Sequence, residues 1–327
     1  MWNNLLSRMR AEYGADEVTW FKCDWLFAEC YLYRRIVGCT AKTKYLKSFD
    51  FFMEQKVEGF NSHLEQIRDG IKYVFAVADN LSIQQERETL EVLLKTQSPI
   101  ESARSLDSYI LCNDLGAAIE RFFLKLKPNN SGSRQFHIVL DNAGPELMGD
   151  LLFAEYLMQV KLVDKTVLHG KEYPYFVSDV TGGDFEWTMA ELKKRGDVFS
   201  AFYDKLSTRL KKGQLAFHDH RFWTYPHPYC QMKSVARELY TQLTEASLIM
   251  FKGDLNYRKL VGDRDWPYGT PLKTALCGFL PAPILALRTL KSETVAGLPD
   301  DVAERMENEP DQKWMTTGEY GIAELAY

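Results

Sequence analysis

The sequence has no long run of apolar residues. Its longest stretch without a charged side chain, Thr274 to Leu287, is interrupted by Pro281 and Pro283 and is too short to cross a membrane. The N-terminal residues carry charges and lack the apolar core of a signal peptide. We therefore expect a protein that is neither secreted nor bound to a membrane, with the cytoplasm as its main location and the nucleus as a second one.

Closely spaced cysteines and an excess of basic residues are also missing. The six cysteines are scattered and include no Cys-x-x-Cys pair, which argues against a cysteine-based metal site and a disulfide framework. Lys and Arg together number 40 against 45 Asp and Glu, so the formal net charge is −5. A nucleic-acid-binding protein normally carries a basic surface, so no nucleic-acid partner is expected.

The composition is that of a globular protein with two regions. Apolar residues make up 46% and charged residues 26% of the chain, which excludes disordered and fibrous classes. Residues 1–130 have the residue spacing of helices, including the stretches Gln84 to Leu94 and Ser105 to Lys127. Turn-forming residues cluster after Lys127, so we predict an N-terminal helical region, 1–130, and a second domain, 131–327.

The second region alternates short apolar runs with helical stretches. The runs are Phe136–Leu140, Thr166–His169, Tyr175–Val177, Leu215–His218, Ala246–Phe251 and Ile284–Leu287. Strands separated by helices predict an α/β fold with a mostly parallel sheet. In such a sheet ligands bind beyond the carboxyl ends of the strands, so the residues that follow each run are candidates for a site.

Oxygen-bearing side chains follow two of these runs. Asp141 and Asn142 end the first strand, a helix is expected from about Glu146, and Asp179 comes soon after Val177. Carboxylate and amide oxygens suit a hard divalent cation such as Mg²⁺ or Mn²⁺. Each residue taken alone is more often a helix cap or a turn residue. The interpretation as a metal site therefore depends on all three residues meeting at one rim.

Cationic side chains follow two further runs. Lys252 and Asp254 flank Gly253 at a predicted strand-to-helix turn, where a helix N-terminus favours a phosphate or a carboxylate. The alternative there is a capped helix with solvated charges. Arg288 and Lys291 either clamp a phosphoryl group or are ordinary surface cations. Together the four strand ends indicate metal-assisted chemistry on a phosphorylated substrate.

Four segments make the sequence similar to a known family. They are Asp141-Asn-Ala-Gly-Pro-Glu146, Phe176-Val-Ser-Asp179, Phe251-Lys-Gly-Asp-Leu-Asn-Tyr-Arg-Lys-Leu260 and Arg288-Thr-Leu-Lys291. The chain resembles the metal-dependent damage-control phosphatases over nearly its whole length, and the last segment matches the RTxK signature of one branch. The resemblance implies a three-layer α/β/α sandwich with an N-terminal helical region. Members usually carry more helical sequence ahead of the matched part, so this chain is expected to start within that region or to be a shorter form.

The resemblance also implies the ligands and the site residues. A divalent metal ion (Mn²⁺, Ni²⁺, Co²⁺ or Mg²⁺) would be held by Asp141, Asn142 and Asp179. The expected substrate is a small sugar phosphate, such as fructose 1-phosphate or fructose 6-phosphate. Its expected contacts, together with the strand-end cations, are Asp141, Asn142, Lys252, Asp254, Leu255, Asn256, Tyr257, Arg258, Arg288 and Lys291. The expected catalytic residues are Asp141, Asp254 and Lys291.

The expected reaction is metal-dependent hydrolysis of a phosphomonoester, in which the metal activates a water molecule. The phosphoryl charge would be neutralised by Lys252, Arg288 and Lys291. Asp254 either orients the water or binds a sugar hydroxyl. A rival mechanism makes Asp141 a nucleophile, but the second Asp that haloacid dehalogenase-type phosphatases place two residues later is Ala143 here.

The alternative function is S-adenosylmethionine-dependent methylation of protein glutamates, an activity assigned to the same branch. Under this alternative Glu146 and Asp179 would contact the methyl donor, and a protein would be the substrate. A methyltransferase usually shows a glycine-rich loop after its first strand, which the segment from Asp141 to Glu146 matches poorly. A site rich in Lys and Arg also suits phosphate better than a sulfonium donor.

Overall fold

The structure is a computed structural model that describes residues 1–77, 87–89, 91, 106–129, 131–310 and 312–327. These residues form a seven-stranded sheet with the order β1-β7-β6-β5-β2-β3-β4. The strands are β1 (Ile110–Asn113), β2 (Gln135–Val139), β3 (Lys165–Gly170), β4 (Leu215–Asp219), β5 (Leu248–Lys252), β6 (Ile284–Thr289) and β7 (Gly321–Ala326). Neighbouring strands from β6 to β4 are parallel, whereas β7 runs antiparallel to β6 and parallel to β1. The predicted α/β class with a mostly parallel sheet is confirmed.

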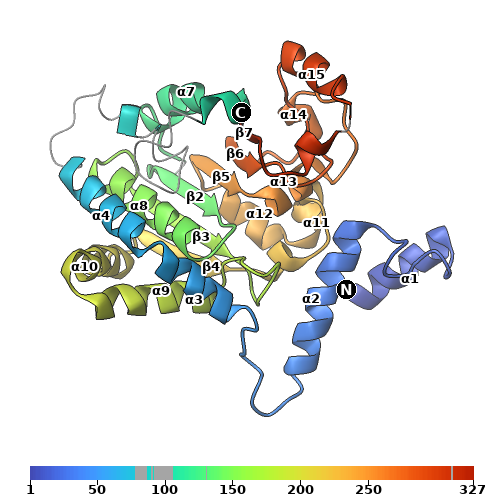
Figure 1. The fold of residues 1–327 in the computed structure, drawn as a ribbon, viewed down its shortest axis with the longest axis horizontal. Helices are drawn as coiled ribbons and strands as arrows, with labels where there is room; N and C mark the ends of the chain where they lie inside the picture. Colours follow the sequence, from blue (N-terminus) through green and yellow to red (C-terminus); the bar gives the residue numbers. More distant parts are fainter. Residues whose placement is uncertain (78–86, 90, 92–105, 130, 311) are drawn as a thin grey trace.

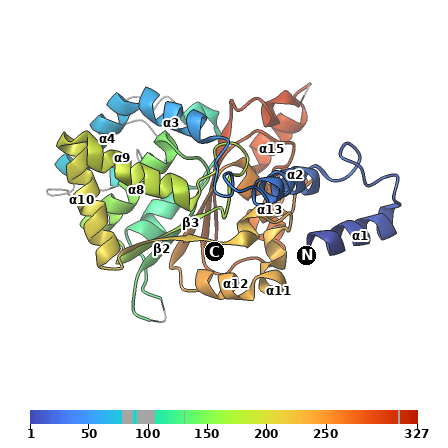
Figure 2. The same ribbon diagram turned by 90° about the horizontal axis from the view of Figure 1, so that it is seen from below.

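Helices cover both faces of the sheet, which gives three layers (Figures 1 and 2). One face carries α8 (Pro145–Gln159), α9 (Gly182–Arg195) and α10 (Asp197–Lys211), and α4 (Leu64–Val77) packs on α8 and α10. The opposite face carries α11 (Met232–Val235), α12 (Arg237–Leu243), α13 (Asp254–Val261) and α14 (Leu272–Ala275). The predicted three-layer sandwich is therefore confirmed.

Each face of the sheet has its own apolar core, because successive residues of a strand point to opposite sides. In β2, Phe136 and Ile138 belong to the core beneath α8, while Val139 belongs to the core beneath α12. A central parallel strand is thus buried on both sides and is mostly apolar. This is why the short apolar runs of the sequence predict these strands.

The N-terminal residues form α1 (Trp2–Tyr13), α2 (Trp25–Thr40) and α3 (Met53–Ser62) ahead of α4. Helices α1 and α2 lie at one side of the molecule (Figure 1). A small apolar cluster, which we call the α2 cluster, joins α2 to the body through Leu26, Cys30, Tyr175 and Leu255. The predicted N-terminal helical region is confirmed, while its boundary at residue 130 stays a prediction.

The remaining helices are short. Helix α7 (Leu115–Ala118) follows β1, and α15 (Asp300–Glu307) precedes β7. In the part of the chain that the structure describes, no helix combines the length and the apolar character needed to span a membrane.

Two expectations about local structure were wrong. The stretch from Ser105 to Lys127 was predicted to be helical, but its described part contains β1, which pairs with β7. The run Tyr175–Val177 was predicted to be a strand, but it forms a turn before α9. Its aromatic rings pack against α2 instead of lying in the sheet. Most of the stretch Gln84 to Leu94 lies outside the described residues.

Candidate functional site

Polar side chains gather in a cavity at the carboxyl ends of β2, β5 and β6. The cavity has a volume of about 780 Å³ and is also lined by the loop after β3 and by β7. The lining residues that were predicted from the sequence are Asp141, Asn142, Glu146, Asp179, Lys252, Asp254, Leu255, Arg288 and Lys291. Adjacent parallel strands end at the same edge of the sheet, which brings these distant segments together.

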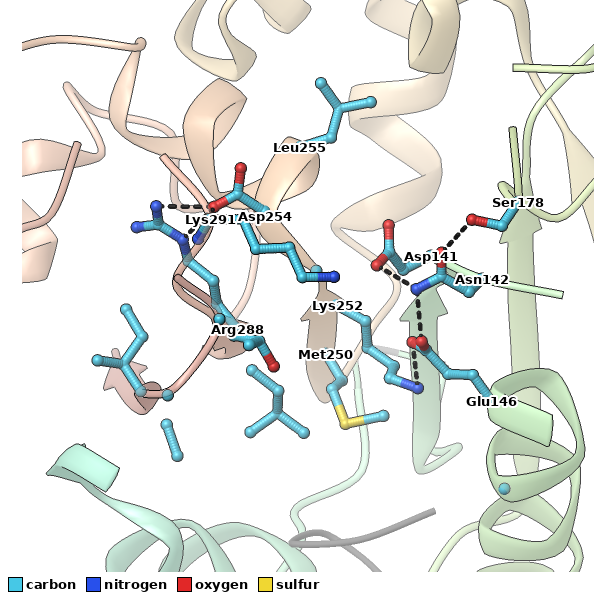
Figure 3. Close-up of a pocket in the computed structure, with 18 of the residues that line it drawn as sticks. Asp141, Asn142, Glu146, Ser178, Met250, Lys252, Asp254, Leu255, Arg288 and Lys291 are labelled. Carbon is cyan, nitrogen blue, oxygen red and sulfur yellow. Dashed lines mark hydrogen bonds and ion pairs between the residues drawn. The ribbon is translucent and has the colours of Figure 1, made fainter. Parts of the chain in front are cut away.

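Asn142 connects the polar groups at the end of β2 (Figure 3). Its Nδ2 donates to Asp141 Oδ2 (2.7 Å) and to Glu146 Oε2 (2.6 Å), and the Ser178 hydroxyl donates to its Oδ1 (2.6 Å). The N-cap position of α8 is Gly144, so neither Asp141 nor Asn142 caps this helix. The side chains of both residues are thus directed to the site instead.

Asp179 is brought to the same place by main-chain contacts. The loop between β3 and α9 forms an isolated antiparallel bridge between Asp179 and Asn142. Next to it, Ala143 N donates to Ser178 O (2.7 Å). On the far side, the ammonium of the buried Lys56, from α3, donates to Asp179 O (3.1 Å). The position of Asp179 therefore depends on backbone hydrogen bonding from two directions.

Burial and mutual repulsion act on the carboxylates of this group. The pKa of Asp141 lies well above its usual value because the group is buried and because Glu146 and Asp179 are close. Burial also raises the pKa of Asp179, against the lowering effect of Lys171, whose ammonium lies 3.2 Å from Asp179 Oδ2. A divalent cation bound by Asp141 and Asp179 would offset both costs. The donor set therefore fits such an ion.

Nitrogen and sulfur ligands are not gathered at this place. Among the described residues, no group of three or more His, Cys, Asp or Glu side chains is arranged to hold a metal ion. A cation here would have to take amide or water oxygens in addition to the two carboxylates, which hard cations such as Mg²⁺ and Mn²⁺ accept.

Lys252, at the end of β5, is paired with two carboxylates. Its ammonium lies 2.8 Å from Glu146 Oε1 and 2.7 Å from Asp150 Oδ1. Burial alone would lower the pKa of Lys252, but the two carboxylates raise it, so the side chain stays charged. Burial raises the pKa of Asp150 to about 7, although Lys252 opposes this. A phosphoryl group would therefore compete with these ion pairs for Lys252.

Asp254 and Arg288 form a second pair, at the ends of β5 and β6. Asp254 Oδ1 accepts hydrogen bonds from Arg288 Nε (2.8 Å), Ser292 Oγ (3.0 Å) and the Lys291 amide (3.2 Å). The other guanidinium N–H groups bond to the carbonyl oxygens of Thr294 and Ser292. Arg288 thus supports Asp254, whereas the sequence predicted a clamp on the phosphoryl group.

Lys291 presents its ammonium group to the cavity. It follows β6 and is exposed, and Figure 3 shows its side chain extending into the space between Asp254 and Asp141. Its ammonium makes no ion pair with any residue that the structure describes. Lys291 is therefore the cation best placed to meet an anionic ligand.

Three predicted substrate contacts lie elsewhere. Asn256 and Tyr257 are buried in the body of the protein, and Arg258 makes two hydrogen bonds to Asp263. None of the three lines the cavity as described. The reason is that successive residues of a helix turn by about 100°, so only the first residues of α13 face the strand ends.

The cavity also contains residues that the sequence did not identify. Trp25, at the start of α2, and Ser178 line it, as do Glu319 and Tyr320 just before β7. Ser178 stands next to Asp179 in the segment after β3, which was an available signal. The residues before β7 carried no such signal, because the residue pattern of β7 does not show that this strand pairs with β6.

The sequence comparisons agree on one family. The sequence model of the "Damage-control phosphatase ARMT1-like domain" matches residues 2–306. Damage-control phosphatase ARMT1 of Mus musculus is 38% identical over 351 residues, which cover 99% of this chain and 80% of the relative. The protein of that name from Xenopus laevis is 34% identical over 100% of this chain and 80% of the relative. The one from Homo sapiens is also 34% identical, over 98% of this chain and 79% of the relative. Among solved structures, a DUF89 family protein from Pyrococcus horikoshii matches with a TM-score of 0.45 at 15% identity, over 99% of this chain and 88% of that chain.

Proposed function

The chain belongs to the ARMT1-like damage-control phosphatases, and on this premise we propose that it hydrolyses small sugar phosphates with the help of a divalent metal ion. Fructose 1-phosphate and fructose 6-phosphate are the proposed substrates. The observation that carries the proposal is that the carboxylates of Asp141 and Asp179 share one cavity with the ammonium of Lys291. A phosphate ester bound through a metal ion needs both kinds of charge.

Asp141, Asn142 and Asp179 are the proposed ligands of the metal ion, which is Mn²⁺, Ni²⁺, Co²⁺ or Mg²⁺ in this proposal. When bound, such an ion acts as a Lewis acid on phosphoryl oxygens and lowers the pKa of a water molecule. The amide oxygen of Asn142 accepts a hydrogen bond from Ser178, while its NH₂ group faces Asp141 and Glu146. An amide oxygen has two lone pairs, so Asn142 Oδ1 can accept from Ser178 and bind the ion at the same time.

Lys291 and Asp254 supply the remaining contacts to the substrate in this proposal. Lys291 neutralises charge on the phosphoryl oxygens, because its ammonium faces the cavity without an ion-pair partner among the described residues. Asp254 Oδ1 already accepts three hydrogen bonds, which fixes the orientation of the carboxylate. We assign the second oxygen of Asp254 to a sugar hydroxyl.

The methyltransferase alternative fits the charges less well. It would place a sulfonium cation beside Glu146 and Asp179. Both carboxylates are already paired with ammonium groups, those of Lys252 (2.8 Å) and Lys171 (3.2 Å). A divalent metal ion at Asp179 meets the same competition from Lys171, so Lys291 decides between the two functions. Its ammonium faces the cavity, where it attracts a phosphate and repels a sulfonium, and we therefore favour phosphate hydrolysis.

A screen of metals against substrates tests the proposal. Protein freed of metal is supplied with Mn²⁺, Ni²⁺, Co²⁺ or Mg²⁺, and phosphate release from each sugar phosphate is measured. We expect release to depend on added metal and to be abolished by Asp141→Ala. The matched control is Asp204→Ala, which removes an exposed carboxylate on α10 and should leave the activity unchanged.

Two results would contradict the proposal. One is phosphate release that needs no metal, and the other is an Asp141→Ala variant with normal activity. Calorimetric titrations with S-adenosylmethionine and, separately, with fructose 1-phosphate plus Mn²⁺ distinguish the two candidate functions. Heat of binding only in the first titration would favour methyl transfer.

A further inference from the structure

The loop that carries Ser178 and Asp179 begins with a strained turn. Phe176 has a φ of 41° and Val177 a φ of 67°. Ser178 N donates to Phe176 O (2.8 Å), so Val177 is the central residue of a γ-turn of the rare type with positive φ. A β-branched residue is sterically unfavourable in that region. Such a turn persists only where the surrounding structure holds it.

The geometry of the candidate site depends on the residues directly after this turn. The Ser178 hydroxyl donates to Asn142 Oδ1 (2.6 Å), and Asp179 forms the isolated bridge with Asn142. The two halves of the donor set, which come from the ends of β2 and from this loop, meet through these contacts. If the turn relaxed, both Ser178 and Asp179 would shift relative to Asp141.

Aromatic side chains of α2 are the contacts that oppose relaxation. The ring of Phe176 lies 5.0 Å from that of Tyr33 and 5.8 Å from that of Trp25, measured between centroids. Trp25 is itself held, because the guanidinium of Arg258 lies 3.8 Å from the centroid of its ring. Val177 is 40% exposed and contributes little packing of its own. The ring contacts of Phe176 therefore hold the start of the turn, in addition to the backbone hydrogen bonds that hold Ser178 and Asp179.

We propose that α2 is a positioning element for the cation site, and that Tyr33 and Trp25 act through Phe176 to keep the turn in its strained form. The inference rests on the proposed metal-dependent function. None of these three residues is a proposed ligand of the cation. They stabilise the one loop conformation in which Ser178 and Asp179 reach Asn142. Tyr33 and Phe176 pack against the α2 cluster, and Trp25 is partly exposed. None of the three belongs to the two cores of the sheet, so the α/β fold does not depend on them.

The test measures Mn²⁺ binding to metal-free protein by calorimetry, without substrate. Phe176→Ala and Phe176→Gly both remove the ring, but only Ala keeps a Cβ at a positive φ. We expect Phe176→Ala to weaken Mn²⁺ binding about tenfold, which corresponds to about 1.4 kcal/mol. Phe176→Gly should bind Mn²⁺ more tightly than Phe176→Ala. Gly is favoured over Ala at a positive φ whatever the role of the residue. A purely structural role therefore predicts that Mn²⁺ affinity stays unchanged in every variant that remains folded.

A second pair of variants tests the contribution of α2. Tyr33→Ala should weaken Mn²⁺ binding, and adding Val177→Gly should restore it, because Gly adopts the native φ of this turn without strain. Val177→Gly alone changes an exposed position and should bind Mn²⁺ at least as tightly as the unchanged protein. Thermal unfolding followed by circular dichroism checks that each variant keeps the fold.

The outcomes separate the inference from the function on which it rests. If the unchanged protein binds no Mn²⁺, the proposed metal-dependent function is wrong. If it binds Mn²⁺ and Phe176→Ala binds equally well, or if Val177→Gly fails to rescue Tyr33→Ala, the role of α2 is wrong while the function stands. Restored binding in the double variant supports the inference.

Discussion

Gly253 offers the sharpest test of how the two central strand ends meet. It lies between Lys252 and the start of α13 with a φ of 87°. A Cβ at this position would overlap the carboxylate of Asp141. Gly253→Ala therefore has two effects, which are backbone strain of about 1–3 kcal/mol and displacement of Asp141 from its present position.

Gly196 separates these two effects. It occupies the N-cap position of α10 with a φ of 71°, and nothing that the structure describes lies within 4 Å of an added Cβ. Gly196→Ala should therefore introduce similar backbone strain without a clash. Both variants should lower the free energy of unfolding by about 1–3 kcal/mol. Only Gly253→Ala should also lose catalytic efficiency, by about 10²-fold, as expected when a catalytic group moves by about 1 Å.

The assay compares kcat/KM for metal-dependent phosphate release with urea unfolding for both variants. A Gly253→Ala variant that retains the kcat/KM of Gly196→Ala would refute the reasoning, because Asp141 would then tolerate displacement. A loss of activity in both variants that follows their loss of stability would refute it as well.

Three other predictions concern charged and titratable groups. Lys252→Met should lower the free energy of unfolding by about 3–5 kcal/mol in urea denaturation, because it leaves buried carboxylates without their cation. Lys291→Met should keep the Mn²⁺ affinity measured by calorimetry but lower kcat/KM for phosphate release by about 10²-fold. Burial lowers the pKa of His137 to about 3 and holds that of His169 well below its usual value. Their neutral forms stabilise the fold above pH ~6.5, and this contribution is lost as the pH falls, because the unfolded chain takes up protons that the folded chain excludes. From pH 7 to pH 5 the loss should be about 2 kcal/mol for His137, with a further loss from His169. Denaturant melts of a His137→Leu/His169→Leu variant should show a smaller loss.

The parallel strands were predictable because burial on both faces leaves a mostly apolar run, as in Phe136–Leu140, where His137 is the one exception. Strand β1 was not, because its four residues lie within a stretch of helix-like spacing and its partner, β7, is at the other end of the chain. Tyr175–Val177 has the composition of a strand. Its rings pack on α2, however, and a local pattern carries no information about so distant a partner.

The site was predictable to the extent that a polar residue directly after a parallel strand lies at the sheet edge, whatever the rest of the chain does. Side-chain direction was not predictable in the same way. Asn256, Tyr257 and Arg258 follow a correctly placed turn, but the rotation of α13 directs them away from the cavity. Lys252 and Arg288 both line the cavity, but each already forms an ion pair. Lys252 pairs with Asp150, which lies outside the motifs, and Arg288 pairs with Asp254, which is distant in the sequence.

The place of β7 in the sheet has a consequence for biosynthesis. It follows β1 and β6 in the sequence, yet it lies between them in the sheet. On the ribosome, β1 and β6 emerge before the strand that joins them, so the edge of β6 waits without its partner and is exposed to pairing with other chains. Ile322 and Ala323 of β7 also form part of the cavity wall. The cavity wall should therefore stay incomplete until β7 has emerged, and nascent chains stalled before that point should bind no substrate.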